Sequence, residues 1–319
     1  MRRFLLLGAK AAVSALLLSL ALRGVGWSAV GQRLRDIDPA WLLATVLILS
    51  AQLFIAALRW REIAQQCGIA LPVSRATRLS FIGAFFSQTL PSTVGGDAAR
   101  IWLLARGGGG WKAATYSVLI DRAAGAAALA VLVLACLPWT LELVRNPIGR
   151  IALLLIGVGT LTGFLVFLAL GALRHTWVAR FWVTHHLTSA AAIAGKLVTS
   201  PRAGGSVAAL SILVHLMSVT AAWGTAKALA VPLDFAHALF LVPPIILIAM
   251  IPISIAGWGV RENAMVVAFA YAGLPESDGL VVSLLFGAAF FVVGAIGGVV
   301  WIASSDRAKT WATPALSRE

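Results

Sequence analysis

Six long apolar runs constrain this chain more than any other feature of its sequence. They cover residues 4–22, 40–58, 113–137, 151–173, 206–230 and 279–303. A hydrocarbon core of about 30 Å takes about 20 helical residues at 1.5 Å each, so each run is long enough to cross a bilayer as a helix. Outer-membrane barrels instead use strands of about 10 residues with alternating hydrophobicity. The runs therefore predict an integral membrane protein of the all-α class.

Composition and charge agree with this class and exclude others. Hydrophobic residues make up 60% of the 319 residues and charged residues 12%, against about 25% charged in soluble domains. A mean hydropathy of +0.94 leaves too little polar surface for a cytosolic enzyme, a disordered chain or a secreted disulfide scaffold. The two cysteines, Cys67 and Cys136, suggest neither disulfide nor metal chemistry. The net charge of +13 would suit a nucleic-acid partner in a soluble protein, but in a membrane protein it marks the loops that stay inside, and we expect no nucleic-acid partner.

The first run has the features of either a signal peptide or a retained helix. It follows Arg2 and Arg3, as the apolar core of a signal peptide does, but Lys10 interrupts it. No small-x-small cleavage site follows it. We predict a retained helix.

Two further apolar regions, residues 78–112 and 236–274, are interrupted by proline and paired small residues. Each interruption has the form Pro-x4-Gly-x3-Arg with a second glycine nearby, and the residues concerned are Pro91, Gly95, Gly96 and Arg100 in the first and Pro252, Gly257, Gly259 and Arg261 in the second. Such residues free backbone groups that lipid cannot satisfy, so these breaks are expected inside protein or beside a wet cavity. The two breaks are separated by about half the chain, which predicts an internal repeat.

The distribution of Lys and Arg favours hairpins that enter and leave the membrane on one side. With this topology only Arg23, Arg33, Arg35, Arg145 and Arg150 lie in outer segments. If the first broken region crossed an odd number of times, the basic loop at residues 174–202 would face outward. In the second half, two nearly complete helices remain an alternative to the hairpin, and the sidedness is the same.

The predicted architecture is six full transmembrane helices plus two broken, re-entrant helical hairpins in an inverted repeat, or eight helices if the hairpins count as spans. It forms a single membrane domain over residues 1–319, with halves at about 1–140 and 147–305 and a short cytoplasmic tail at 306–319. Both termini are predicted to be cytoplasmic.

Six charged residues lie where lipid would reject them, and we predict that they form a substrate-binding site near the membrane midplane. They are Asp97, Arg100, Asp121, Arg122, Arg261 and Glu262. A charge at the bilayer centre costs about 2.5 to 3.5 kcal/mol on insertion scales, so such groups are usually paired or face a cavity. An arginine just beyond a break lies beside the free N–H groups of a helix start, an arrangement that suits an anion such as phosphate.

Structural roles for these residues stay open at this point. Asp97 could cap the second limb of its hairpin, and Glu262 suits the first turn of a helix. The arginines could form salt bridges with nearby acids. His215, in mid-span, could relay a proton or bond a neighbouring helix. No catalytic triad, metal cluster or nucleotide motif is evident in the sequence, and we expect no metal and no cofactor.

The break motif at residues 91–100, followed by Asp121-Arg122 and later by residues 254–262, resembles the lysylphosphatidylglycerol synthase transmembrane-region family. The likeness spans about residues 4–303, with Ala256 where the family often has glycine. That family includes the flippase portion of bacterial aminoacyl-phosphatidylglycerol synthases and stand-alone membrane proteins, some of which are associated with hopanoid biosynthesis. The resemblance therefore implies lipid translocation. Only residues 304–319 follow the last span, whereas the bifunctional relatives carry a soluble transferase domain, so we expect no synthesis of lysylphosphatidylglycerol.

Two functions of different class follow. The first is a lipid flippase that moves an anionic or phosphate-bearing lipid, of phospholipid, polyprenyl-phosphate or hopanoid type, across the bacterial inner membrane by alternating access. The second is a membrane-embedded enzyme or accessory subunit of polyprenyl-phosphate or hopanoid lipid biosynthesis, in which Asp97 or Asp121 acts as general base. Membrane lipids are the expected partners, with lipid-biosynthesis enzymes as further candidates, and the oligomeric state stays open.

Overall fold

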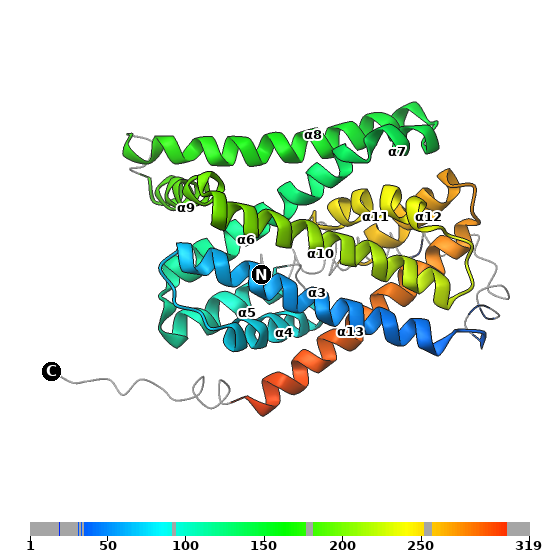
Figure 1. Cartoon of the computed structure of the whole chain (residues 1–319), viewed down its shortest axis with the longest axis horizontal. Coiled ribbons are helices and arrows are strands. Elements are labelled where there is room, and N and C mark those ends of the chain that lie inside the picture. The colour runs from blue at the N-terminus through cyan, green and yellow to red at the C-terminus, as the bar shows by residue number, and fades with distance from the viewer. Residues whose placement is uncertain are drawn as a thin grey trace.

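The computed structural model describes residues 19, 31, 33, 35–90, 94–176, 181–251 and 257–304, and all regular structure in these residues is helical (Figure 1). In chain order the helices are α3 (Pro39–Gln66), α4 (Val73–Thr89), α5 (Gly95–Leu104), the π-helical turn η1 (Ala105–Gly109), α6 (Trp111–Ala135), α7 (Leu137–Leu143), α8 (Pro147–Leu170), the 3-10 turn η2 (Gly171–His175), α9 (Trp182–Thr199), α10 (Pro201–Ala228), α11 (Phe235–Ala249), α12 (Val260–Tyr271) and α13 (Glu276–Ala303).

Five helices are long and apolar enough to cross a membrane, which makes this a multi-pass membrane protein. They are Pro39–Gln66, Trp111–Ala135, Pro147–Arg174, Pro201–Ala228 and Glu276–Ala303. Five of the six predicted spans are thereby confirmed, although all five helices begin before the predicted run. Of the predicted span at residues 4–22 only residue 19 is described, and the predicted tail at 306–319 lies outside the described residues.

Three of the long helices begin with a polar cap followed by proline. The carboxylate of Asp38 accepts a hydrogen bond from the Ala40 N–H at 2.8 Å, and Asn146 caps α8 in the same way through the Ile148 N–H, also at 2.8 Å. Ser200 precedes Pro201 at the start of α10. The side chains satisfy N–H groups that a helix start leaves free, and proline has none to lose in the first turn.

The two broken regions form pairs of shorter helices. The limbs α4, α5, α11 and α12 contain 17, 10, 15 and 12 residues. At 1.5 Å per residue the longest reaches about 25 Å, which is less than the ~30 Å of a hydrocarbon core. In the second break, Gly257 and Gly259 have φ angles of 80° and 85°, a conformation that glycine adopts readily. Pro91 and Pro252 lie outside the described residues.

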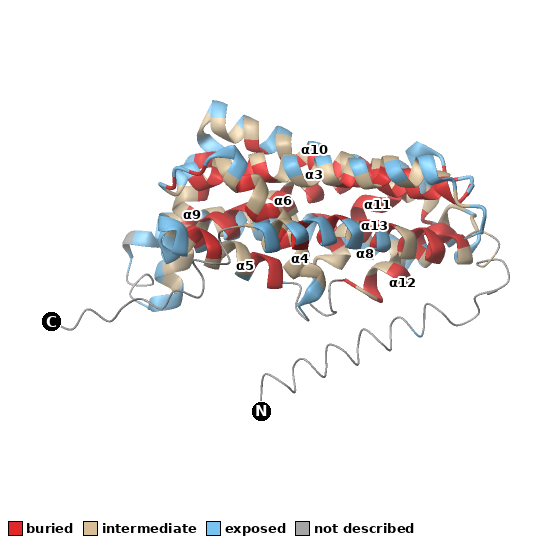
Figure 2. Ribbon diagram, turned by 90° about the horizontal axis from the view of Figure 1, so that it is seen from below, coloured by how far each residue is buried: buried red, intermediate tan, exposed pale blue. Residues whose placement is uncertain are grey.

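The long helices cross at close range through small residues. Helix α3 packs along α10, and α13 packs on α4. At the α4–α13 crossing, a methyl group on Gly297 would collide with the backbone carbonyl of Phe81. Figure 2 shows the buried residues on the inward faces of the helices. Helix α8 runs along one edge of the molecule (Figure 1), and Gly157 is its one buried residue.

Candidate functional site

The first hairpin places Asp97 against Arg122 of α6. Helix α5 starts at Gly95 with Val94 in the cap position, so Asp97 lies in the first turn and is not the N-cap. Its carboxylate accepts two hydrogen bonds from Arg122, 2.7 Å from Nε and 3.0 Å from Nη2. This two-point geometry is the strong form of a carboxylate–guanidinium pair.

Asp121 lies between two arginines and is 3% exposed. One oxygen accepts from Nε of Arg59 at 2.8 Å, and the other accepts from Nη2 of Arg100 at 3.1 Å. The Arg100 guanidinium also lies 4.0 Å from the ring centre of Trp60. Asp121 and Arg122 therefore point to different partners, as neighbours on a helix do.

The second hairpin holds its arginine by a separate network. Arg261 donates to Oε1 of Glu262 through Nη2 at 2.6 Å, and its Nε donates to Ser283 of α13 at 3.1 Å. Glu262 is fully buried in the first turn of α12, where its Oε2 accepts from the Gly259 N–H at 2.6 Å. This acid therefore stabilises the helix start and orients Arg261. Glu262 thus lies in the first turn of its helix as predicted, and Arg100 and Arg261 have the salt bridges to acids that the sequence had left open as an alternative.

Glycines make room for three of the arginines. A methyl group at Gly83 would lie 2.9 Å from Cγ of Arg100, and one at Gly125 would lie 3.2 Å from Nη1 of Arg59. At Gly287 of α13 a methyl group would collide with Nη2 of Arg261. Two of these glycines lie on α6 and α13, the helices that follow the two hairpins.

Two adjoining polar cavities, of about 220 and 290 Å³, connect these groups. The smaller contains Gly96, Asp97 and Arg100 in its wall, and the larger contains His215 and Arg261. Five residues line both: Arg59, Gln88, Asp121, Arg122 and Phe290.

Arg122 has the most open side chain among the paired arginines of the site, at 47% exposed. Glu262, Gly95, Gly257 and Gly259 line neither polar cavity. The structure thus brings five of the six predicted charged residues to the cavities and leaves Glu262 behind Arg261.

Arg59 is the site residue that the sequence reasoning missed. The predicted span ended at residue 58, which assigned Arg59 to an inside loop, whereas α3 continues to Gln66 and buries Arg59 to 7% exposure. The spacing of Gln52, Ala56 and Arg59 places all three on one helix face, and all three line the polar cavities. This spacing could have identified Arg59 as a site residue from the sequence.

The charges of the site do not cancel once Arg59 is included. Four guanidinium groups meet three carboxylates, which leaves one positive charge. His215 donates from Nε2 to the carbonyl of Gly125 at 2.9 Å and borders the larger cavity. In the part of the chain that is described, no group of three His, Cys, Asp or Glu could hold a metal ion. The geometry suits an anion.

The comparisons with known proteins point to one family. Residues 8–298 match the family model described as lysylphosphatidylglycerol synthase TM region. No curated protein and no solved structure matches the chain.

Proposed function

Because the chain belongs to the lysylphosphatidylglycerol synthase TM region family, we propose that it is a flippase that moves an anionic, phosphate-bearing lipid across the membrane. One observation carries this proposal: adjoining polar cavities inside a bundle of spanning helices join arginines from both hairpins and have one excess positive charge. An uncompensated charge in a membrane interior is expensive unless a counter-ion or water meets it. An anionic head group is that counter-ion.

The arginines divide into two roles. Arg59 and Arg100 are largely buried and both pair with Asp121, so their role is structural. Arg122 and Arg261 both line the larger cavity and come from opposite halves of the chain. Their planar forks match phosphate oxygens, and charge-assisted hydrogen bonds of this kind contribute about 1.5 to 3 kcal/mol each. A phosphate between them would replace Asp97 as the partner of Arg122.

An inverted repeat supplies the alternating access. Helices α3 and α10 pack together, α4 packs on α13, and α11 packs on α6. These contacts are symmetric if α3 corresponds to α10, α4 and α5 to α11 and α12, and α6 to α13. The pattern supports the assignment of halves at about 1–140 and 147–305, which rock about the site in turn. We place the protein in the bacterial inner membrane with both termini in the cytoplasm.

The hydrogen bonds favour transport over the enzyme alternative. Both oxygens of Asp97 accept from Arg122, and both oxygens of Asp121 accept from arginines. Use of either carboxylate as a general base would protonate a group whose charge-assisted hydrogen bonds depend on its ionised form, and those bonds would be weakened.

Leaflet exchange in liposomes tests the proposal. Purified protein is reconstituted with headgroup-intact phosphatidylglycerol that carries a fluorescent acyl chain, and dithionite reports which leaflet holds the label. The wild type accelerates exchange over empty vesicles. Arg122→Ala and Arg261→Ala each lower the rate about 10- to 100-fold, the equivalent of one lost charge-assisted contact.

Arg61→Ala is the matched control, since Arg61 lies on α3 in a partly exposed pair with Glu62. It leaves the rate unchanged. Exchange equal to that of empty vesicles, or full activity in both cavity variants, contradicts the proposal. A change in the mass of the lipid would support the enzyme alternative.

A further inference from the structure

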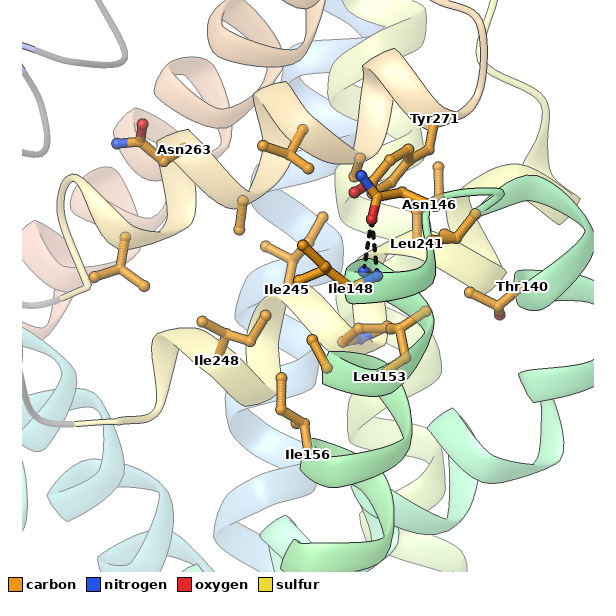
Figure 3. Close-up of a pocket in the computed structure, with 18 residues that line it drawn as sticks. Thr140, Asn146, Ile148, Leu153, Ile156, Leu241, Ile245, Ile248, Asn263 and Tyr271 are labelled. Carbon is orange, nitrogen blue, oxygen red and sulfur yellow. Dashed lines mark hydrogen bonds between the residues drawn. The ribbon is translucent and has the colours of Figure 1, made fainter.

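A third cavity lies behind the second hairpin, on the side away from the arginines. It has a volume of about 520 Å³ and lies between α7, α8, α11 and α12. Figure 3 shows Ile148, Leu153 and Ile156 of α8 and Leu241, Ile245 and Ile248 of α11 around this space. The wall is mostly aliphatic, and its polar side chains are Thr140, Asn146, Asn263 and Tyr271.

Three polar side chains of this wall, those of Thr140, Asn146 and Asn263, form hydrogen bonds within the protein. Asn146 Oδ1 accepts from the N–H groups of Ile148 and Gly149 at the start of α8. Asn263 donates from Nδ2 to the Gly259 carbonyl at 2.7 Å. Water occupies a cavity when two or more polar groups need it. These bonded groups offer water little, so an apolar occupant is favoured.

Two consecutive prolines shape the α11 wall. Pro243 and Pro244 lie inside the helix, and Pro244 has no N–H to donate to the carbonyl of Phe240. Thr140 of α7 donates to that carbonyl instead, at 3.4 Å. The exposed backbone group is therefore satisfied by a neighbouring helix, and the surface toward the cavity stays apolar.

The cavity is partly open to the surroundings of the molecule, since Ile148 and Val267 of its wall are 77% and 48% exposed. Outward residues of α8 such as Ile151 and Leu155 are 56% and 68% exposed, as expected for a lipid-facing helix. On the opposite side the hairpin itself is the partition. Val260 and Ala264 of α12 face the apolar cavity, whereas Arg261 borders the polar one.

We propose that this cavity binds a hydrocarbon chain of the lipid whose charged head group occupies the arginine site. The inference rests on the proposed function, because it takes the head group and the chain to belong to one molecule. The hairpin α11–α12 then separates the two parts of the substrate, with charge on one face and hydrocarbon on the other. Burial of apolar surface contributes about 25 cal/mol per Å² and needs no directional partner, which suits chains of differing structure.

A photoreactive residue in the wall identifies the occupant. The full chain with Tyr271→p-benzoylphenylalanine, and separately with Ile248→p-benzoylphenylalanine, is reconstituted in phosphatidylglycerol vesicles and irradiated. Mass spectrometry is expected to find phosphatidylglycerol attached through an acyl chain. Attachment to the peptide of residues 4–22, to a second copy, or to no molecule at either position overturns the inference.

Filling the cavity tests its role in transport. Ala264→Phe is expected to lower both acyl-chain crosslinking at position 248 and leaflet exchange at least about fivefold. Ala169→Phe, at an exposed position of α8 away from the cavity, changes neither. Unchanged crosslinking in a folded Ala264→Phe protein overturns the inference. Intact exchange by the wild type with no crosslink at position 248 or 271 rejects the chain site and keeps the proposed function. A crosslink without exchange keeps the chain site and rejects the proposed function.

Discussion

At the scale of residues, the charged groups of the site differ mainly in how far they are open to the cavities. Arg59 and Asp121 are 7% and 3% exposed and bond each other, so they act as parts of the fold. The side chain of Arg122 is 47% exposed and lines both polar cavities. Substitutions of the two kinds should therefore separate loss of stability from loss of binding.

Arg59→Met is expected to destabilise the protein. The change leaves Asp121 buried with one guanidinium partner where it had two, and breaking a buried pair costs about 3 to 5 kcal/mol. Arg61→Met on the same helix removes a partly exposed pair that contributes less than about 1 kcal/mol. Unfolding in detergent, monitored by circular dichroism, measures the loss of stability in both variants. Equal losses in the two variants would contradict the role given to Arg59.

Cys67 is expected to react slowly with alkylating reagents. Burial raises the pKa of its thiol to about 12, so the reactive thiolate is a fraction of about 10⁻⁴ at pH 8, against about 0.2 for an ordinary cysteine. Labelling by iodoacetamide should be at least about 100-fold slower in the native protein than in detergent-denatured protein and should rise with pH up to about 11. Equal rates in the two states would contradict the raised pKa of this thiol.

At the scale of helices, the long spanning helices could be predicted from the sequence, whereas the residues at which they begin and end could be predicted only in part. Apolar runs of about 20 residues predict spans directly, because a segment in lipid must satisfy its backbone hydrogen bonds internally and a helix does so. Helix α3 extends to Gln66 since Trp60, Ile63 and Ala64 are fully buried against other helices, and hydropathy alone does not report such packing. Because the predicted span ended before this extension, Arg59 was assigned to a loop.

The crossing of α4 and α13 provides a test at this scale. Gly297→Ala adds a methyl group against the Phe81 backbone, which cannot move without shifting α4. Gly163→Ala on α8 meets open space. Since alanine is favoured over glycine in a helix by about 1 kcal/mol, the control should be neutral or more stable, whereas Gly297→Ala should unfold more easily. Stabilisation by both would contradict the close crossing.

At the scale of the whole molecule, the sequence predicted that the two breaks matter, and the structure places Arg100 and Arg261, which follow them, in the walls of two adjoining cavities. The repeated Pro-x4-Gly-x3-Arg pattern located Arg100 and Arg261, and the charges at Asp97, Asp121 and Arg122 were identified by their position in apolar regions. Which acid pairs with which arginine depends on the packing of α3, α5 and α6, and no local spacing encodes it. The apolar cavity behind α12 likewise arises from two helix pairs, α7–α8 and α11–α12, that are distant from each other in sequence.

The sidedness predicted from the basic loops is testable by cysteine labelling. In a background with Cys67 and Cys136 replaced by alanine, Glu276→Cys lies at the start of α13 and Thr199→Cys at the end of α9. A membrane-impermeant maleimide should label position 276 in intact spheroplasts and position 199 only after permeabilisation. The reverse pattern would invert the topology and contradict the cytoplasmic placement of the termini.

The central claim is that arginines of both halves bind the anionic head group of a lipid inside the membrane, and lipid analysis of the purified protein tests it most directly. Lipids that copurify with the wild type and with Arg122→Gln are compared by mass spectrometry after both proteins are shown to unfold at the same temperature. The wild type should be enriched in a phosphate-bearing anionic lipid, and the variant should lose at least about tenfold of that enrichment. Equal amounts of the lipid in both proteins, or no enrichment in the wild type, would contradict the claim.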